Sequence, residues 1–110
     1  MSKPVVLRPR ADADIDEIFA YLRRRSPQVA RKFLGAVESA FVLLSEQPAI
    51  GSKRHAEYLP DLPHPLRFCP LKEFERVLIY YMERPDCVDV IRIWDAARGL
   101  EALVTDTDQP

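Results

Sequence analysis

The sequence predicts an α+β fold, in which a short N-terminal strand is followed by an antiparallel helical hairpin packed on a small antiparallel β-sheet, in the order β-α-α-β-β-β. Two long segments repeat apolar residues with helical spacing, and three later segments are rich in β-branched and aromatic residues. A chain of 110 residues is about one domain long. We therefore expect a single domain over residues 1–110, with a flexible tail at residues 105–110.

Composition and charge indicate an ordinary globular protein. The chain is 47% hydrophobic and 30% charged. No apolar run approaches the roughly 18 to 20 residues that span a bilayer, and the first residues do not read as a signal peptide, so we expect a cytoplasmic protein without membrane contact. The net charge of −1 is not concentrated in a basic half, which disfavours direct binding to nucleic acid.

The first helix is predicted from Pro9 onwards. It follows Val5–Leu7, a short β-branched segment that predicts an edge strand, and it ends at the basic residues 23–25. Asp14 and Glu17 are assigned to its charged, solvent-facing side. Its apolar face, at positions i, i+3, i+4 and i+7, consists of Ile15, Ile18, Phe19 and Leu22.

The second helix is predicted between Ser26 and Gln47. Ser26 and Pro27 read as an N-cap followed by a proline at the first helical position, and Pro48 ends the pattern. Because the link between the two helices is so short, they should pack as an antiparallel hairpin. The inward positions are Ala30, Phe33, Leu34, Val37, Ala40, Phe41 and Leu44.

Residues 48–65 are predicted to be a loop, because they contain four prolines and no periodicity. Three strands follow at residues 66–69, 76–82 and 88–94, with hairpin-length connections that predict an antiparallel meander. Residues 92–103 read as a strand that runs into a short helix.

Both faces of the middle strand are predicted to be apolar, with Val77, Ile79 and Tyr81 on one side and Leu78, Tyr80 and Met82 on the other. In the last strand, one face is predicted to hold Val88, Val90, Arg92 and Trp94. The helices cover only one side of the sheet. We therefore expect the other side to lie bare and to bind a protein partner.

The sequence favours neither a cofactor nor a metal. It has no phosphate-binding glycine loop and no Gly-x-Ser-x-Gly motif. Cys69 and Cys87 are interpreted as small buried apolar groups rather than as a disulfide, and His55 and His64 as polar loop residues. We expect no cofactor and no metal site.

Four arginines form the one group of residues in the sequence that could bind an anionic ligand. Guanidinium groups on a sheet and at its edge hold phosphate or carboxylate in a bidentate manner, but they also form ordinary salt bridges with neighbouring acids. The sequence leaves both readings open. The arginines are Arg67, Arg76, Arg92 and Arg98, and the neighbouring acids are Glu75, Asp89 and Asp95.

The pattern over roughly residues 5–104 resembles the RelE/ParE family of type II toxins, in particular its ParE branch. The segments that carry the resemblance are RADADIDEIFAYL, SPQVARKFLGAVESAFVLLSEQPAIGS, LRFCPLKEFERVLIYY and VDVIRIWDAARGLEAL. The resemblance implies a helical hairpin laid on a small antiparallel sheet. The spacing of apolar residues predicts the same arrangement independently.

The resemblance also separates two activities. RelE-like members are ribosome-dependent mRNA endonucleases, whereas ParE-like members inhibit DNA gyrase. The family arginines are retained at Arg76 and Arg98, but Pro63 and Pro65 stand where RelE enzymes place two lysines, and Val104 stands where they place a tyrosine. Because those groups supply charge stabilisation and proton transfer, we expect a gyrase inhibitor and no enzyme activity.

The ending of the chain departs from the usual ParE pattern, which reads like H-G-A-R-D. Here the corresponding residues are Asp95, Ala96, Ala97, Arg98 and Gly99. Because the histidine and the aspartate are absent, the resemblance does not by itself imply full potency against gyrase.

The resemblance implies a cognate ParD-like antitoxin, a ribbon-helix-helix DNA-binding protein, which neutralises the toxin in a hetero-oligomer. Such pairs act in plasmid or chromosomal stability. Alternatives are a RelE-like mRNA endonuclease, or a degenerate toxin that retains only antitoxin binding. The expected partner-binding residues are Arg76, Trp94, Arg98, Leu100 and Leu103.

Overall fold

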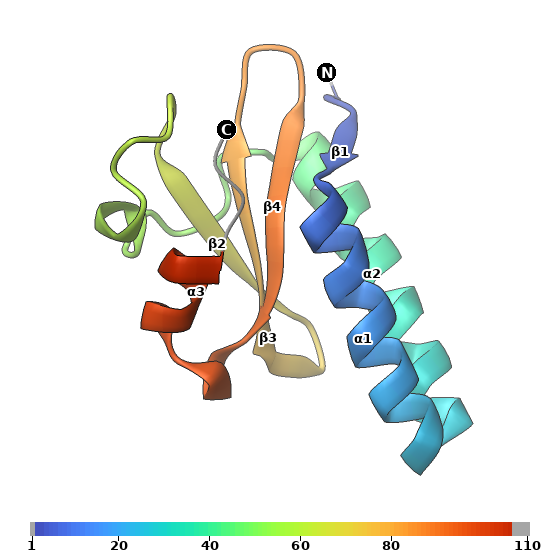
Figure 1. Cartoon of the computed structure of the whole chain (residues 1–110). Coiled ribbons are helices and arrows are strands. Elements are labelled where there is room, and N and C mark those ends of the chain that lie inside the picture. Colours follow the sequence, from blue (N-terminus) through green and yellow to red (C-terminus); the bar gives the residue numbers. More distant parts are fainter. Residues whose placement is uncertain (1, 107–110) are drawn as a thin grey trace.

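The structure is a computed structural model that describes residues 2–106. Its helices and strands follow in the predicted order, with two 3-10 turns and with the predicted short helix after the last strand (Figure 1). The elements are β1 (Val5–Leu7), α1 (Pro9–Arg25), α2 (Pro27–Glu46), η1 (Ala56–Tyr58), β2 (Leu66–Leu71), β3 (Phe74–Glu83), β4 (Val88–Asp95), η2 (Ala96–Arg98) and α3 (Leu100–Asp106). The predicted flexible tail thus begins inside α3, and residues 107–110 lie outside the described part of the chain.

The sheet has four strands in the order β1-β4-β3-β2. The predicted antiparallel meander of β2, β3 and β4 is confirmed. The sheet as a whole is mixed rather than antiparallel, because β1 lies parallel to β4, with Val5 opposite Val88. Charges fix this edge: Arg8 Nε lies 3.1 Å from Asp89 Oδ1, and Lys3 Nζ lies 2.9 Å from Glu83 Oε2.

The β2–β3 connection is tighter than predicted. The sequence suggested a link over residues 70–75, but only Lys72 and Glu73 lie outside the two strands. Glu73 has a φ of 71°, the left-handed region that a tight turn requires. Its backbone N–H donates to the carboxylate of Glu75 at 2.6 Å, which holds the turn in place.

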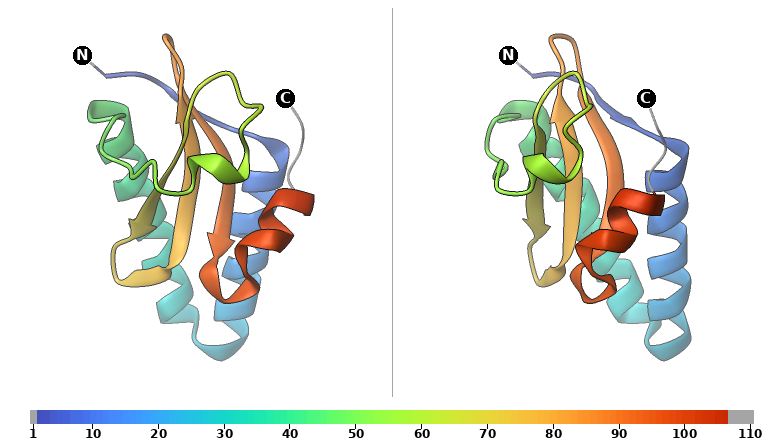
Figure 2. Two further views of the ribbon diagram at one scale, coloured as in Figure 1. Left: turned by 90° about the vertical axis from the view of Figure 1, so that its left-hand side faces the viewer. Right: turned by 60° about the vertical axis from the view of Figure 1, so that its left-hand side comes forward.

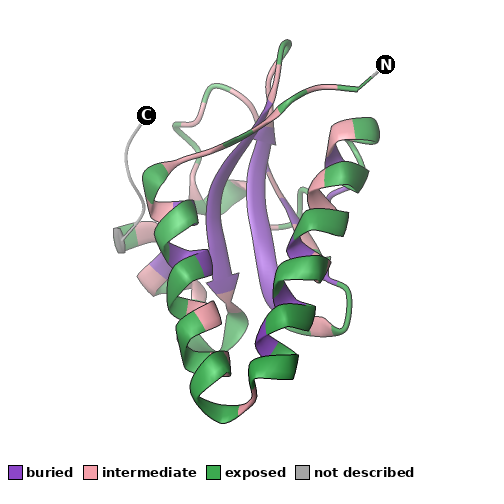
Figure 3. Ribbon diagram, turned by 90° about the vertical axis from the view of Figure 1, so that its right-hand side faces the viewer, coloured by how far each residue is buried: buried purple, intermediate pink, exposed green. Residues whose placement is uncertain are grey.

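The helical hairpin packs on one face of the sheet, as predicted. Ser26 Oγ accepts a hydrogen bond from the backbone N–H of Val29 at 3.3 Å, so this residue caps α2 directly after α1 ends. The strands that lie beneath the two helices are buried, whereas the outer surfaces of both helices are exposed (Figure 3). The core on this side consists of Ala11, Ile15, Phe33, Val37, Leu44, Leu71, Val77, Ile79, Tyr81, Val88, Val90 and Ile93.

The second face of the sheet is covered by the chain itself, so the predicted bare face is wrong. The loop that contains η1 and the helix α3 lie over this face (Figure 2). Gly99, with a φ of 79°, lets the chain turn back after β4, and α3 then places Leu103 among the residues of the second core. That core consists of Leu66, Phe68, Leu78, Tyr80, Met82, Ile91, Trp94 and Leu103.

The alternation of side chains is as predicted in β3 but not in β4. Arg92 lies opposite Tyr80, whereas the next pair joins Val90 to Tyr81, so Ile91 is an extra residue. This β-bulge inverts the alternation along the rest of the strand. The predicted common face of Val88, Val90, Arg92 and Trp94 is therefore wrong. The helix side holds Val88, Val90 and Ile93, and the opposite side holds Ile91 and Trp94.

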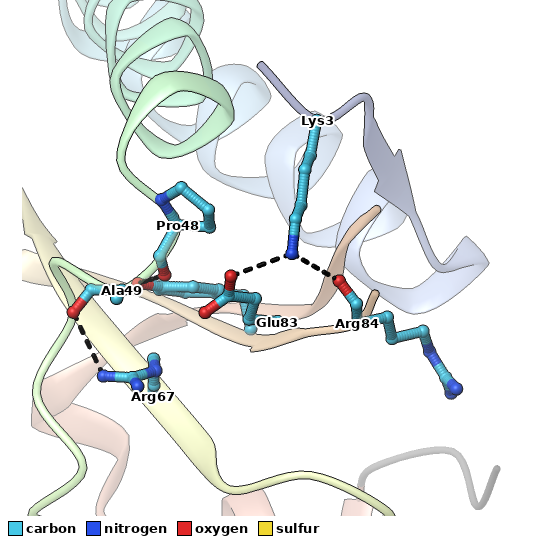
Figure 4. A network of polar contacts seen from close by, with 7 residues as sticks. Lys3, Pro48, Ala49, Arg67, Glu83 and Arg84 are labelled. Atoms are coloured by element: carbon cyan, nitrogen blue, oxygen red, sulfur yellow. Dashed lines mark hydrogen bonds and ion pairs between the residues drawn. The ribbon is translucent and has the colours of Figure 1, made fainter. Parts of the chain in front are cut away.

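The long loop after α2 is tied to the sheet at its beginning. The Tyr81 hydroxyl donates to the carbonyl of Pro48 at 2.8 Å and accepts from the backbone N–H of Gly51 at 2.8 Å. Arg67 Nη1 donates to the carbonyl of Ala49 at 3.1 Å (Figure 4) and to the carbonyl of Gly51 at 3.0 Å. Hydrogen bonds thus replace the regular structure that the prolines prevent.

His55 fastens the same loop further along. Its ring stacks on Phe68 with centroids 4.2 Å apart, and its Nδ1 lies 2.8 Å from the Tyr80 hydroxyl. Burial, together with the nearby Tyr58, raises the pKa of Tyr80 to about 12. The hydroxyl therefore stays protonated at neutral pH. Burial and then the charge of Arg54 lower the pKa of His55, which favours the neutral ring.

Candidate functional site

A groove opens between the C-terminal half of α1 and the ends of β3 and β4. It encloses about 390 Å³. Apolar side chains on the helix and the sheet form much of its surface, and charged groups stand among them. The lining residues are Asp14, Glu17, Ile18, Tyr21, Leu22, Phe74, Val77, Ile93, Asp95 and Arg98. This combination of apolar surface and a few charges is typical of a site that binds another chain.

Arg98 is exposed and is held in place by Trp94. The guanidinium carbon lies 4.1 Å from the centroid of the indole ring, which is a close cation–π contact. Trp94 is itself fixed, because its Nε1 donates to the carbonyl of Gly99 at 3.1 Å. Asp95 Oδ1 accepts from the backbone N–H of Ala97 at 2.9 Å and so caps the turn η2 that carries Arg98.

Arg76, near the start of β3, lies beside Asp95 at the end of β4. Its Nη2 is 3.5 Å from Asp95 Oδ1, and its side chain is 75% exposed. An exposed ion pair of this length contributes about 0 to 1 kcal/mol. Arg76 therefore remains available to a carboxylate on another molecule, and Asp95 links it to the turn that carries Arg98.

The structure divides the five predicted partner-binding residues into two groups. Arg76 and Arg98 are exposed, and Leu100 is partly buried. Trp94 and Leu103 are both 0% exposed, because α3 folds over the sheet and seals them in the second core. Trp94 contacts Arg98 from inside the protein, and in this conformation neither Trp94 nor Leu103 offers surface to a partner.

Arg92 forms a salt bridge, but not with any of the acids that the sequence suggested. The acids that the sequence offered were Glu75, Asp89 and Asp95. Arg92 instead donates from Nε and Nη2 to the two carboxylate oxygens of Asp14, at 2.7 and 2.8 Å. Asp14 Oδ2 also accepts from the backbone N–H of Ile93 at 3.0 Å. The carboxylate thereby satisfies an edge group of β4 that the short strand β1 does not reach.

Asp14 was assigned to the solvent, yet it is only 4% exposed, and Arg92 only 2%. A signal in the sequence could have revealed this. Asp14 follows the buried Ala11 by three residues and precedes Ile18 by four, so helical geometry places it on the apolar face. A carboxylate on such a face needs a buried cation.

The remaining candidate ligands and nucleophiles do not gather into a metal site. No group of three potential metal ligands occurs within residues 2–106. Cys69 and Cys87 are free thiols and are partly rather than fully buried, which corrects the prediction for both. Burial raises the pKa of the Cys69 thiol. In the same described part of the chain, no helix is long and apolar enough to cross a membrane.

The comparison with protein families agrees with this geometry. The family model described as the ParE toxin of the type II toxin-antitoxin system parDE matches residues 5–100. No curated protein matches the chain. The matched segment begins at β1 and ends at the start of α3, so it includes the helical hairpin, the whole sheet and Arg98. The chain therefore belongs to the ParE toxin family of type II toxin-antitoxin systems.

Proposed function

We propose that this toxin acts by binding DNA gyrase and inhibiting it, and that a ParD-like antitoxin neutralises it by occupying the groove beside α1. The observation that carries the proposal is this groove, in which apolar surface adjoins the exposed Arg98. Apolar anchors combined with a few fixed cations are the usual basis of protein–protein affinity.

The groove suits an amphipathic segment of an antitoxin. Ile18, Leu22 and Phe74 would receive its apolar side chains, and Arg98 with Arg76 would pair with its carboxylates. Two further carboxylates line the groove, Glu17 on the helical wall and Asp95 at the end of β4, while that of Asp14 is paired with Arg92. A matching segment would place acidic side chains next to the turn η2 and apolar side chains against α1.

Binding rather than cleavage follows from the chemistry of the residues present. Pro63, Pro65 and Val104 stand where RelE-like enzymes carry lysines and a tyrosine, and their side chains neither transfer protons nor stabilise a phosphate. The arginines do not converge on one place, since Arg92 is committed to Asp14 and Arg67 donates to loop carbonyls. We infer that the protein is not an enzyme.

A gyrase assay tests the proposal directly. Purified toxin should inhibit supercoiling or increase gyrase-mediated DNA cleavage, and an equimolar amount of the cognate antitoxin should reverse the effect. Unchanged gyrase activity at a micromolar excess of toxin would refute gyrase as the target.

Two further assays separate the alternatives. Cuts in transcripts at codons within translating ribosomes would indicate an mRNA endonuclease. If induction of the toxin without antitoxin fails to arrest growth, although the antitoxin still binds, the chain is a degenerate toxin.

A further inference from the structure

The buried ion pair between Asp14 and Arg92 lies directly behind the groove. α1 runs alongside β4 (Figure 1), and the pair joins these elements across 78 positions of the chain. Asp14 is both a partner of this pair and a lining residue of the groove. We propose that Asp14 is a positioning residue, which acts through Arg92 and Trp94 to hold Arg98 in the orientation that binds the partner.

The geometry connects these residues in one continuous series. Asp14 fixes the guanidinium of Arg92 with two hydrogen bonds, and the carbon of that guanidinium lies 4.9 Å from the centroid of the Trp94 ring. The same ring lies 4.1 Å from the guanidinium carbon of Arg98. Trp94 is thus flanked by two cations, the first buried and fixed, the second exposed at the groove.

The Asp14–Arg92 pair does not contact the partner itself. It affects affinity by restricting the side chain of Arg98 before binding. A long arginine side chain loses rotamer freedom when it binds, and that loss weakens affinity unless the side chain is already held in place. Trp94 provides such a hold for Arg98, and the Asp14–Arg92 pair limits the movement of Trp94. The pair also fixes α1 to β4, which are the two walls of the groove.

The inference rests on the proposed groove, so its test begins with the toxin alone. Trp94 is the only tryptophan of the chain, which makes its fluorescence specific for this place. The main variant is Asp14→Asn combined with Arg92→Gln, which removes both charges and leaves neither one buried without a counter-ion. Asp16→Asn, at an exposed position of α1, is the matched control for the loss of one carboxylate.

Quenching of the Trp94 fluorescence by acrylamide is the first measurement. The double variant should keep a cooperative melt but show a quenching constant raised about twofold or more, since the ring loses one of its two flanking cations. Asp16→Asn should match the wild type. A folded double variant with unchanged quenching would overturn the inference whatever the partner does.

Affinity for the cognate antitoxin is the second measurement. The double variant should bind about 2- to 10-fold more weakly, in line with the ordering of one long side chain at an interface. Arg98→Met should weaken binding less in the double variant than in the wild type, because the first change has already disordered Arg98. Strictly additive losses would overturn the positioning role.

The two failures are distinguishable. If Arg98→Met binds antitoxin as tightly as the wild type does, Arg98 is no partner residue and the proposed groove fails, together with the part of the inference that concerns binding. If Arg98→Met weakens binding while the quenching constant of the double variant stays at the wild-type value, the groove stands and Asp14 has only a structural role.

Discussion

Gly51 is the position at which adding a single methyl group should perturb this fold most specifically. A Cβ atom at this position would overlap the hydroxyl oxygen of Tyr81 and would stand 2.7 and 2.9 Å from two of its ring carbons. The Tyr81 ring belongs to the core beneath the helices and is itself 0% exposed. Because the ring cannot swing into solvent, Gly51→Ala must displace either Tyr81 or the start of the loop.

The cost follows from the contacts at that hydroxyl. Displacement breaks the bond from Gly51 N–H and the bond to the Pro48 carbonyl, both 2.8 Å long. Each such bond contributes about 0.5 to 1.5 kcal/mol, and an added carbon in a packed site costs about 1 to 3 kcal/mol. We therefore expect Gly51→Ala to lower the free energy of unfolding by about 2 to 6 kcal/mol.

Urea unfolding of four proteins measures this effect: the wild type, Gly51→Ala, Tyr81→Phe and the double variant. Tyr81→Phe removes the atom nearest to the new methyl group, so the two losses should be less than additive. Gly35→Ala is the matched control. No heavy atom lies within 4 Å of its added Cβ, and alanine is favoured over glycine in a helix by about 1 kcal/mol, so this variant should be more stable. If Gly51→Ala unfolds at the wild-type midpoint, the close approach does not exist.

Three further predictions concern the core, the groove and pH. Phe33→Ala should cost about 3 to 5 kcal/mol in urea unfolding, because Phe33 is fully buried edge-on against Phe74; a loss below about 1 kcal/mol would contradict a packed core. Arg98→Ala should reduce toxicity or antitoxin affinity while lowering stability by no more than about 1 kcal/mol, the value of its contact with Trp94; loss of the cooperative melt would instead show a structural role. Since the pKa of Tyr80 is raised from 10 to about 12, its neutral form favours the folded state, so the stability that it contributes is present below pH 10 and is lost as the pH rises toward 12. In Tyr80→Phe, the fall of the melting temperature over this range should be shallower, and an equally steep fall would refute the assignment.

Local patterns in the sequence were sufficient to predict most of the architecture. Pro9, Pro27 and Pro48 mark the helix boundaries, and alternation along β3 places its residues on both faces of the sheet as the structure has them. These features depend on neighbours a few positions apart, for which helical and strand periodicity give a direct reading.

The larger errors arise from contacts between distant parts of the chain. The pair of Arg92 with Asp14 spans 78 positions, so no spacing rule links the two residues. The bulge at Ile91 depends on how β4 pairs with β3, and one extra residue reverses every later side chain. The cover of the second face depends on the path after Gly99, which a short helix of ordinary composition does not reveal.

The site shows the same division. Arg76 and Arg98 were found from the family pattern, and both are exposed. Trp94 and Leu103 were expected beside them at the surface, but their burial depends on α3 lying over the sheet. Exposure is a property of the assembled tertiary structure, and the sequence alone placed these residues near each other without showing which of them faced solvent.

The parallel pairing of β1 with β4 has a consequence for synthesis. The strand made first, Val5–Leu7, has no neighbour until Val88–Asp95 has left the ribosome, and Asp14 likewise waits for Arg92. Domains rich in such distant pairings fold slowly, and the nascent helical hairpin exposes its apolar side in the meantime. The folded toxin therefore forms only after β4 has been translated, about 80 residues behind the strand β1 that it completes.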